Sequence, residues 1–319
     1  MDAPQLAFKE RAAAALADGA LKIAIERTTG NAERKRAAAV AAFPEFEAAR
    51  ARGKAIKDHV IAHLDHYLEM FERNATAAGA QVHWAADDAE ARAIITRICL
   101  EADAKLVTRA KSMLGEEIGL PHALADAGIE RVETDLAEHI IQLAGERPSH
   151  IVWPAMHRTR EQVAILFKEA HHPPPAADDP ATMVQSARRE LRAKFLGADI
   201  GISGANFMVA DTGATCTVTN EGNADLSGNV PPLQIHSIGI EKLIPRVADL
   251  GVFIRLLSRS ALGSPITQYT SHFRAPRPGT EMHFVIVDNG GYAEIEEQMV
   301  DRDMEPFAVR LARPDFAQL

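Results

Sequence analysis

Glycine, hydroxyl, amide and carboxylate residues are concentrated in one stretch of the chain, residues 201–229. Glycine lets backbone N–H groups approach a ligand closely, and successive N–H groups in such loops can form a site for an anion. The candidate ligand-binding residues in this stretch are Ser203, Gly204, Asp211, Thr212, Gly213, Asn220, Glu221 and Gly222. The stretch is not a P-loop, because no Gly-Lys-Ser/Thr follows, and its glycine spacing is not that of a dinucleotide-binding fingerprint. The composition predicts a cradle for a small anion, and a set of tight turns in a meander is an equally open alternative.

Charged residues also lie near the ends of two predicted strands, residues 105–110 and 131–135. They are Lys111, Glu116, Glu117, Glu133 and Asp135. The carboxyl ends of parallel strands share one edge of a sheet, where α/β proteins bind their ligands. We therefore add Lys111 and Glu117 to the candidate ligand-binding residues. Helix capping, with first-turn acids that favour the helix dipole, is the alternative explanation.

The histidines and cysteines do not form the pattern of a metal site. His59, His63 and His66 recur at helical spacing, but no third type of ligand is indicated, so we predict a solvated or partner-facing surface and no metal. The chain has two cysteines, Cys99 and Cys216. Two thiols exclude a four-cysteine zinc site or an all-cysteine iron–sulfur cluster built from this chain alone. We expect both cysteines to be buried structural residues.

The hydrophobic pattern that must position these residues divides the chain into three stretches. Residues 1–79 are rich in helix-forming residues and are predicted to be helical, with a long last helix that ends before Gly79. Residues 80–198 alternate amphipathic helices with short strands, the last of them at 150–154, which is typical of βα units around a mostly parallel sheet. Residues 199–290 are rich in strands.

A tight turn is predicted between the strands 206–210 and 214–219. We expect this connection to bring residues 211–213 and 220–222 together in one pocket at the carboxyl edge of the sheet, facing Lys111 and Glu117. Replacing Gly213 by valine is then expected to block the approach of the backbone to a ligand at little cost in stability.

Composition limits the class of protein. The chain has 319 residues, of which 47% are hydrophobic and 25% charged, and its net charge is −9. The negative charge argues against nucleic acid or an anionic membrane surface as a partner. No apolar run reaches the roughly 18 residues of a membrane span. Charged residues stand near the N-terminus where a signal peptide would have its apolar core, so we expect a cytoplasmic protein.

Several long blocks of sequence carry a resemblance to a known family. They are SMLGEEIGLPHALADAGIERVETD from residue 112, ISGANFMVADTGATCTVTNEGN from 202, IHSIGIEKLIP from 235 and FVIVDNG from 284. With these blocks the chain resembles the lactate-utilisation (LUD) domain of the lactate-utilisation protein B family. The resemblance implies a three-layer α/β/α sandwich similar to the NagB/RpiA/CoA-transferase-like group. It also implies three parts: an N-terminal helical extension (1–79), the LUD α/β domain (80–290) and a divergent C-terminal tail (291–319).

The resemblance further implies a role and partners. The family oxidises L-lactate to pyruvate in a complex with two sister proteins, and its B component looks like an electron carrier. The family's 4Fe–4S clusters are held by ferredoxin-type cysteine runs that follow the Val-Asp-Asn-Gly element. No cysteine follows Gly290 here, so we expect no cofactor in this chain. We expect a docking or small-anion-binding module that works with the two sister lactate-utilisation subunits.

Two other classes of function stay open. One is a stand-alone enzyme or binding protein for a small carboxylate, acyl-CoA or phosphate ester, and the other is a pure assembly scaffold. CoA-transferase relatives use a glutamate nucleophile in a short Glu-Asn-Gly-like turn, and Glu221 lies in a similar turn within TNEGN, residues 219–223. Glu221 is therefore the candidate catalytic residue if the chain is an enzyme.

Overall fold

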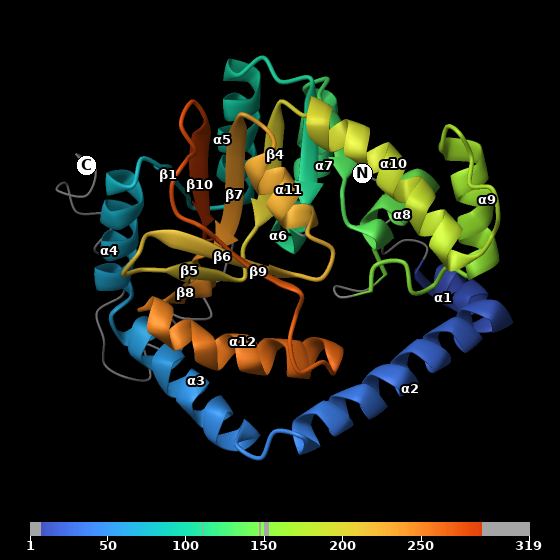
Figure 1. Cartoon of the computed structure of the whole chain (residues 1–319), viewed down its shortest axis with the longest axis horizontal. Helices are drawn as coiled ribbons and strands as arrows, with labels where there is room; N and C mark the ends of the chain where they lie inside the picture. Colours follow the sequence, from blue (N-terminus) through green and yellow to red (C-terminus); the bar gives the residue numbers. More distant parts are fainter. Residues whose placement is uncertain (1–7, 111, 147, 150–152, 289–319) are drawn as a thin grey trace. The chain divides into compact units, whose positions relative to one another are not determined.

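The structure is a computed structural model of the chain, and it describes residues 8–110, 112–146, 148–149 and 153–288. The chain divides into two compact units, each assembled from separate segments (Figure 1). The sheet unit consists of Glu45–Thr134, Lys194–Leu256 and Ile266–Leu319, and the helical unit of Met1–Pro44, Asp135–Ala193 and Leu257–Pro265. Residues 45–79 thus belong to the same unit as the sheet, and the division of the chain at residues 79 and 290 stays a prediction.

A six-stranded parallel sheet forms the centre of the sheet unit. In spatial order its strands are β1 (Gln81–Ala85), β10 (Glu281–Val287), β7 (Leu233–Gly239), β4 (Ile200–Gly204), β2 (Leu106–Ala110) and β3 (Glu130–Glu133). Every neighbouring pair is parallel. The three central strands β10, β7 and β4 are almost entirely buried, as expected for a sheet that is covered on both faces. The prediction of an α/β fold with a mostly parallel sheet is confirmed.

Helices cover both faces of this sheet. On one face α4 (Leu64–Ala77) packs against β7 and β10, where the rings of Phe71 and Phe284 are 5.6 Å apart. On the same face α11 (Asn223–Asn229) lies against β4, because Gly201 has no side chain and the backbone of Ser227 takes that space. On the opposite face α5 (Asp88–Glu101) and α7 (Leu120–Asp126) pack against Ile202 and its neighbours. The result is a three-layer α/β/α arrangement.

A second sheet of four strands belongs to the same unit. Its order is β8 (Leu243–Ile244), β5 (Phe207–Val209), β6 (Ala214–Thr219) and β9 (Tyr269–Phe273). β5 and β6 form an antiparallel hairpin, and β9 pairs antiparallel with β6. The Nζ atom of Lys57, in α3 (Phe46–Ala62), donates to the carbonyl of Leu243 over 2.8 Å, which ties α3 to β8. The glycine-rich stretch 201–229 is therefore shared between two sheets.

The prediction of one long helix that ends before Gly79 is wrong, because two helices, α3 and α4, meet at His63. This residue has φ −137° and ψ 38°, outside the helical region. Its Nδ1 atom lies 2.9 Å from the carbonyl oxygen of His59, so the side chain hydrogen-bonds to the backbone at the point where the helix is broken. Val60 and Leu64 nevertheless continue one buried stripe across the break, which explains why periodicity did not reveal it.

The helical unit contains α1 (Phe8–Ala17), α2 (Gly19–Ala41), α8 (Leu136–Ala144), α9 (Arg160–Ala170) and most of α10 (Pro180–Gly197). Phe167 and Met183 belong to a core that α8, α9 and α10 share. A capping box formed by Thr159 and Gln162 begins α9. Of the strand predicted at 150–154, residues 150–152 lie outside the described residues, and residues 153 and 154 are not in a strand.

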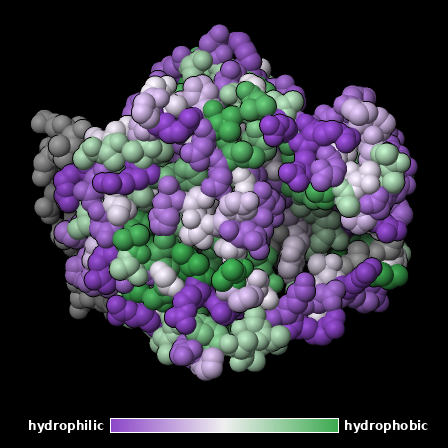
Figure 2. Space-filling model, in the orientation of Figure 1, coloured by the Kyte–Doolittle hydropathy of each residue, from purple (hydrophilic) through white to green (hydrophobic). Residues whose placement is uncertain are grey.

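The described surface is mixed in character. Hydrophobic patches alternate with hydrophilic residues on the face that Figure 2 shows. Exposed apolar side chains such as Leu100, Ile165 and Leu196 come from three different helices. Among the helices that the structure describes, none has the length and apolar character needed to cross a bilayer.

Candidate functional site

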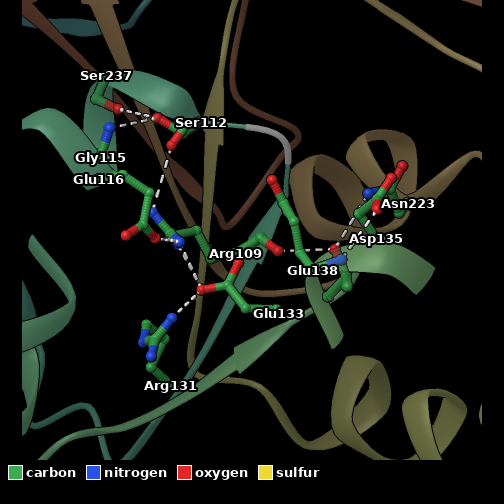
Figure 3. Close-up of polar contacts among 11 residues, drawn as sticks. Arg109, Ser112, Gly115, Glu116, Arg131, Glu133, Asp135, Glu138, Asn223 and Ser237 are labelled. Carbon is green, nitrogen blue, oxygen red and sulfur yellow. Dashed lines mark hydrogen bonds and ion pairs between the residues drawn. The ribbon is translucent and has the colours of Figure 1, made fainter. Parts of the chain in front are cut away.

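A buried arginine marks the carboxyl end of β2. Arg109 is 2% exposed, and its Nε atom donates to Oε1 of Glu133 on the neighbouring strand β3 over 2.7 Å. Its Nη1 atom donates to the carbonyl of Ser112 over 3.3 Å. Figure 3 shows the guanidinium surrounded by these groups. An arginine in this position is held by charge-assisted hydrogen bonds, which are the strong ones in proteins.

A second glutamate and a second arginine complete the network. Nη2 of Arg109 forms an ion pair with Glu116, and Nη1 of Arg131 forms one with Glu133 (Figure 3). The two glutamates differ in their surroundings: the side chain of Glu133 is 3% exposed, whereas that of Glu116 is 31% exposed. A buried charge is tolerated only when it is paired, so Glu133 offsets the cost of burying Arg109, while Glu116 stands at the solvent side.

The loop after β2 shapes this site. Ser112 caps the short helix α6 (Met113–Glu117), since its Oγ atom accepts from the backbone N–H of Gly115 over 3.0 Å. A Cβ atom on Gly115 would lie 2.6 Å from Nη1 of Arg109, so glycine allows the guanidinium to pack against α6. The Oγ atom of Ser112 is also 3.2 Å from that of Ser237 in β7. Hydroxyl groups from two elements thus lie beside the arginine.

The site lies where the order of the sheet changes direction. From β2 the chain continues outwards to β3, whereas from its neighbour β4 it continues the other way, to β7 and β10. Open α/β sheets bind ligands at such a switch point, at the carboxyl ends of the strands. Arg109 pairs in register with Ile202, and Ala110 with Ser203. The carboxyl ends of β2 and β4 are therefore adjacent at this point.

Two of the predicted ligand-binding residues lie at this edge. Ser203 is 1% exposed, and its Oγ atom donates to the carbonyl of Gly204 over 2.8 Å. The same carbonyl accepts from Oγ1 of Thr217 in β6 over 3.0 Å. In register, Ser203 pairs with His236 of β7, whose burial lowers its pKa to about 3 and keeps the ring neutral.

A second group of predicted residues lies close to the same edge. Residues 220–222 follow β6, and Gly222 starts α11 with a left-handed backbone, φ 74°. The next residue, Asn223, donates through Nδ2 to Oγ1 of Thr134, just after β3, over 3.4 Å (Figure 3). Asn223 is 3% exposed, and its Oδ1 atom has no hydrogen-bond partner among the described residues. Asn223 was not among the predicted site residues, although it directly follows residues 220–222.

The remaining predicted residues of this stretch lie elsewhere, and the expected convergence is wrong. Residues 211–213 precede the six-residue strand β6 and residues 220–222 follow it, so the two turns are at opposite ends of the strand. Asp211 accepts from the backbone N–H of Val247 over 3.0 Å at the start of α12 (Val247–Leu262). A Cβ atom on Gly213 would overlap the backbone of α4 and lie 2.7 Å from Cα of Ala75. The expectation that valine at Gly213 costs little stability is therefore also wrong.

Comparison with known proteins identifies the family of this fold. The description of the matching family is LUD domain, and the match covers residues 68–291. The chain belongs to the LUD domain family. Lactate utilization protein B of Bacillus thuringiensis (strain Al Hakam) is 37% identical over 291 residues, and that of Bacillus cytotoxicus (strain DSM 22905 / CIP 110041 / 391-98 / NVH 391-98) is 38% identical. Each alignment covers 89% of this chain and 61% of the relative, so the chain spans about three fifths of the relatives' length.

One solved structure was also matched. It is the crystal structure of a DUF162 family protein from Deinococcus radiodurans, and it matches 70% of this chain and 97% of its own length. The two sequences are 11% identical, and the TM-score is 0.39.

The charged residues predicted after strand β2 of the LUD domain have different outcomes. Glu117 is the last residue of α6, the helix that carries Glu116, and Lys111 lies outside the described residues. Glu116 and Glu133 were among the charged residues predicted near the strand ends, whereas Arg109 was not. The signal was present, because an arginine inside an otherwise apolar strand must find a partner if the sheet is buried. Ser237 was not predicted as a site residue either, because it lies inside a predicted strand.

The cysteines of this LUD domain do not fit an iron–sulfur cluster. Cys99 of α5 and Cys216 of β6 are both fully buried. Burial raises the pKa of both thiols to about 12, which disfavours the thiolate that binds iron. A 4Fe–4S cluster is held by four thiolates, and the chain contains two cysteines. The absence of a cofactor stays a prediction.

The histidines expected on one helical face have partners of their own. Nε2 of His59 lies 2.9 Å from the hydroxyl of Tyr67, and the rings of His59 and His63 are 4.5 Å apart. Within the part of the chain that the structure describes, no three His, Cys, Asp or Glu residues are grouped to hold a metal ion. That no metal binds remains a prediction.

Proposed function

We propose that this LUD-domain chain takes part in the use of L-lactate, through its oxidation to pyruvate, as a module that binds a small anion. The observation that carries the proposal is the similarity to proteins named lactate utilization protein B, at 37% and 38% identity over 89% of this chain. Arg109 supports the second part, because a guanidinium at the switch point of a parallel sheet is suited to a planar anion such as a carboxylate.

The proposed binding site combines the residues at the carboxyl edge. Arg109 would be the positive group, with the hydroxyls of Ser112 and Ser237 as hydrogen-bonding groups, while Ser203, Gly204 and residues 220–222 would line the same carboxyl edge, Ser203 from the other face of the sheet. We further propose that the chain works together with two sister lactate-utilisation subunits. Because the chain has two buried cysteines, electrons from lactate would pass through other groups of that complex.

Deletion of the gene in its host tests the proposed role. The mutant is expected to lose growth on L-lactate as the only carbon source and to regain it when the chain is supplied from a plasmid. Growth on pyruvate is the matched control, because pyruvate enters metabolism after the proposed oxidation. A deletion mutant that grows normally on L-lactate would contradict the proposal, and so would one that also fails on pyruvate.

A second candidate function is a stand-alone enzyme that acts on a small carboxylate, an acyl-CoA or a phosphate ester. The observation in its favour is the position of Glu221, whose turn leads to Asn223 and Thr134 at the carboxyl edge. Release of free CoA from an acyl-CoA by the purified chain, abolished in Glu221→Gln, would favour this function over the first.

A further inference from the structure

The two glutamates that pair with Arg109 are held very differently. Glu133 comes from the sheet itself, in register with Arg109, and its side chain is 3% exposed. Glu116 comes from α6, a helix of five residues, and its side chain is 31% exposed. Rotating Glu133 away would leave a charge buried in the sheet, whereas Glu116 can rotate into water. One partner of the guanidinium is therefore fixed, and the other is exchangeable.

The exchangeable partner occupies the position that a ligand carboxylate would take. Arginine binds carboxylates through parallel N–H donors, and Nη2 of Arg109, which lies 2.7 Å from Oε1 of Glu133, also pairs with Glu116 at the solvent side. Gly115 lets the guanidinium lie against α6, because a Cβ atom there would be 2.6 Å from Nη1 of Arg109. We propose that Glu116 acts as an internal stand-in for a small monocarboxylate, which displaces it from Arg109 on binding. This deepens the proposed function, since it rests on the binding of a small anion at this edge.

The charges around Arg109 favour replacement of Glu116 by the ligand over addition of the ligand beside it. Glu116 pairs with Arg109, and Glu133 pairs with both Arg109 and Arg131. A carboxylate added beside Glu116 and Glu133 would be repelled by both, but one that replaces Glu116 at the guanidinium leaves the number of carboxylates at Arg109 unchanged while Glu116 moves into water. A dicarboxylate or a phosphate ester would bring a second negative charge next to Glu133.

The neighbouring hydroxyls narrow the class of ligand. Ser112 and Ser237 place two Oγ atoms 3.2 Å apart, and the carbonyl of Ser112 accepts from Arg109. Each hydroxyl can donate and accept, so the pair can satisfy either a hydroxyl or a carbonyl next to a carboxylate. A short 2-hydroxy or 2-oxo monocarboxylate, as in the proposed function, is compatible with these groups.

Titration calorimetry with L-lactate and with pyruvate tests the exchange on the full chain. Because Glu116 competes with the ligand, Glu116→Gln is expected to tighten binding at least tenfold, and Glu116→Asp, which keeps the charge but is shorter, about threefold. The matched control is Glu101→Gln, which removes an exposed glutamate from another arginine pair, with Arg97, and is expected to leave the affinity unchanged. L-lactamide, which lacks the carboxylate charge, is expected not to bind.

Three results would overturn the exchange. Glu116→Gln could bind L-lactate no more tightly than the unaltered chain. Glu116→Asp could leave the affinity unchanged while Glu116→Gln raises it, which would show a general effect of charge. L-lactamide could bind as tightly as L-lactate. The growth test separates this inference from the proposed function: normal complementation without the expected affinities refutes the exchange alone, and the expected affinities without complementation refute the role in lactate use alone.

Discussion

The two turns that flank β6 contain the same kinds of residues but have different neighbours. Residues 211–213 are an acid, a threonine and a glycine, and residues 220–222 are an amide, an acid and a glycine. The first turn is packed against α4 and the start of α12, whereas the second leads into α11 beside Thr134. Two turns of similar composition therefore have different positions: one packs inside the fold, and the other lies at the edge where α/β proteins bind ligands. Only the tertiary contacts distinguish them.

The glycines of the two turns make the difference measurable. Gly213 and Gly222 have similar left-handed backbones, with φ 65° and 74°. A Cβ atom on Gly213 would overlap the backbone of α4, which is fixed. A Cβ atom on Gly222 would lie 3.2 Å from the ring of Tyr269, a half-exposed side chain that can rotate. The same substitution should thus have unequal costs at the two ends of β6.

The largest effect is expected for Gly213→Val. Backbone strain and the overlap with α4 together should lower the free energy of unfolding by about 4 kcal/mol. Gly222→Val should lower it by about 2 kcal/mol, mainly from strain. Gly128→Val is the matched control, because Gly128 has φ 73° and nothing within 4 Å of its added Cβ. Urea unfolding followed by circular dichroism gives all three values, and equal losses at Gly213 and Gly128 would remove the distinction between the turns.

Most elements of the fold could be predicted, because the signals for them are local. The strands near residues 81–85 and 106–110 follow from alternation of apolar runs with amphipathic helices, and the parallel sheet follows from that order. The packing of residues 211–213 against α4 could not be predicted, because it joins Gly213 to Ala75 across more than a hundred residues of sequence. The ion pair of Arg109 with Glu133 needed the register of β2 and β3, which no local pattern supplies.

Acid should destabilise the strand that separates the two turns. His236 is fully buried next to β6, where its Nδ1 atom lies 3.4 Å from Oγ1 of Thr215, and burial lowers its pKa to about 3. In the unfolded chain this pKa is near 6.5, so below that pH the unfolded state binds the proton first. The contribution of His236 to the free energy of unfolding is fully present above about pH 6.5 and falls as the pH drops toward 3. The loss is about 3 kcal/mol by pH 4.

Urea unfolding between pH 7 and 4 measures this loss, and His236→Phe is the comparison variant. Phenylalanine fills a similar space beside Phe273 and Phe284 without titrating. The variant should have a flatter profile over this range, although other groups titrate there as well. An identical profile in both proteins would show that His236 does not contribute to the loss of stability in acid.

The smallest effects on stability should come from the acids of the two turns, and they separate the turns most sharply. Asp211→Ala removes the side chain that accepts from Val247 at the start of α12, so a loss of about 1 kcal/mol is expected, as for a helix cap. Glu221→Gln changes an exposed residue, so the expected change in stability is below about 0.5 kcal/mol.

Affinity for L-lactate should respond in the opposite order. Glu221→Gln removes a negative charge at the proposed binding edge and should tighten binding about twofold to threefold, whereas Asp211→Ala should leave it unchanged. Calorimetry on both variants measures these affinities. A changed affinity in Asp211→Ala together with an unchanged affinity in Glu221→Gln would place the ligand at the opposite end of β6.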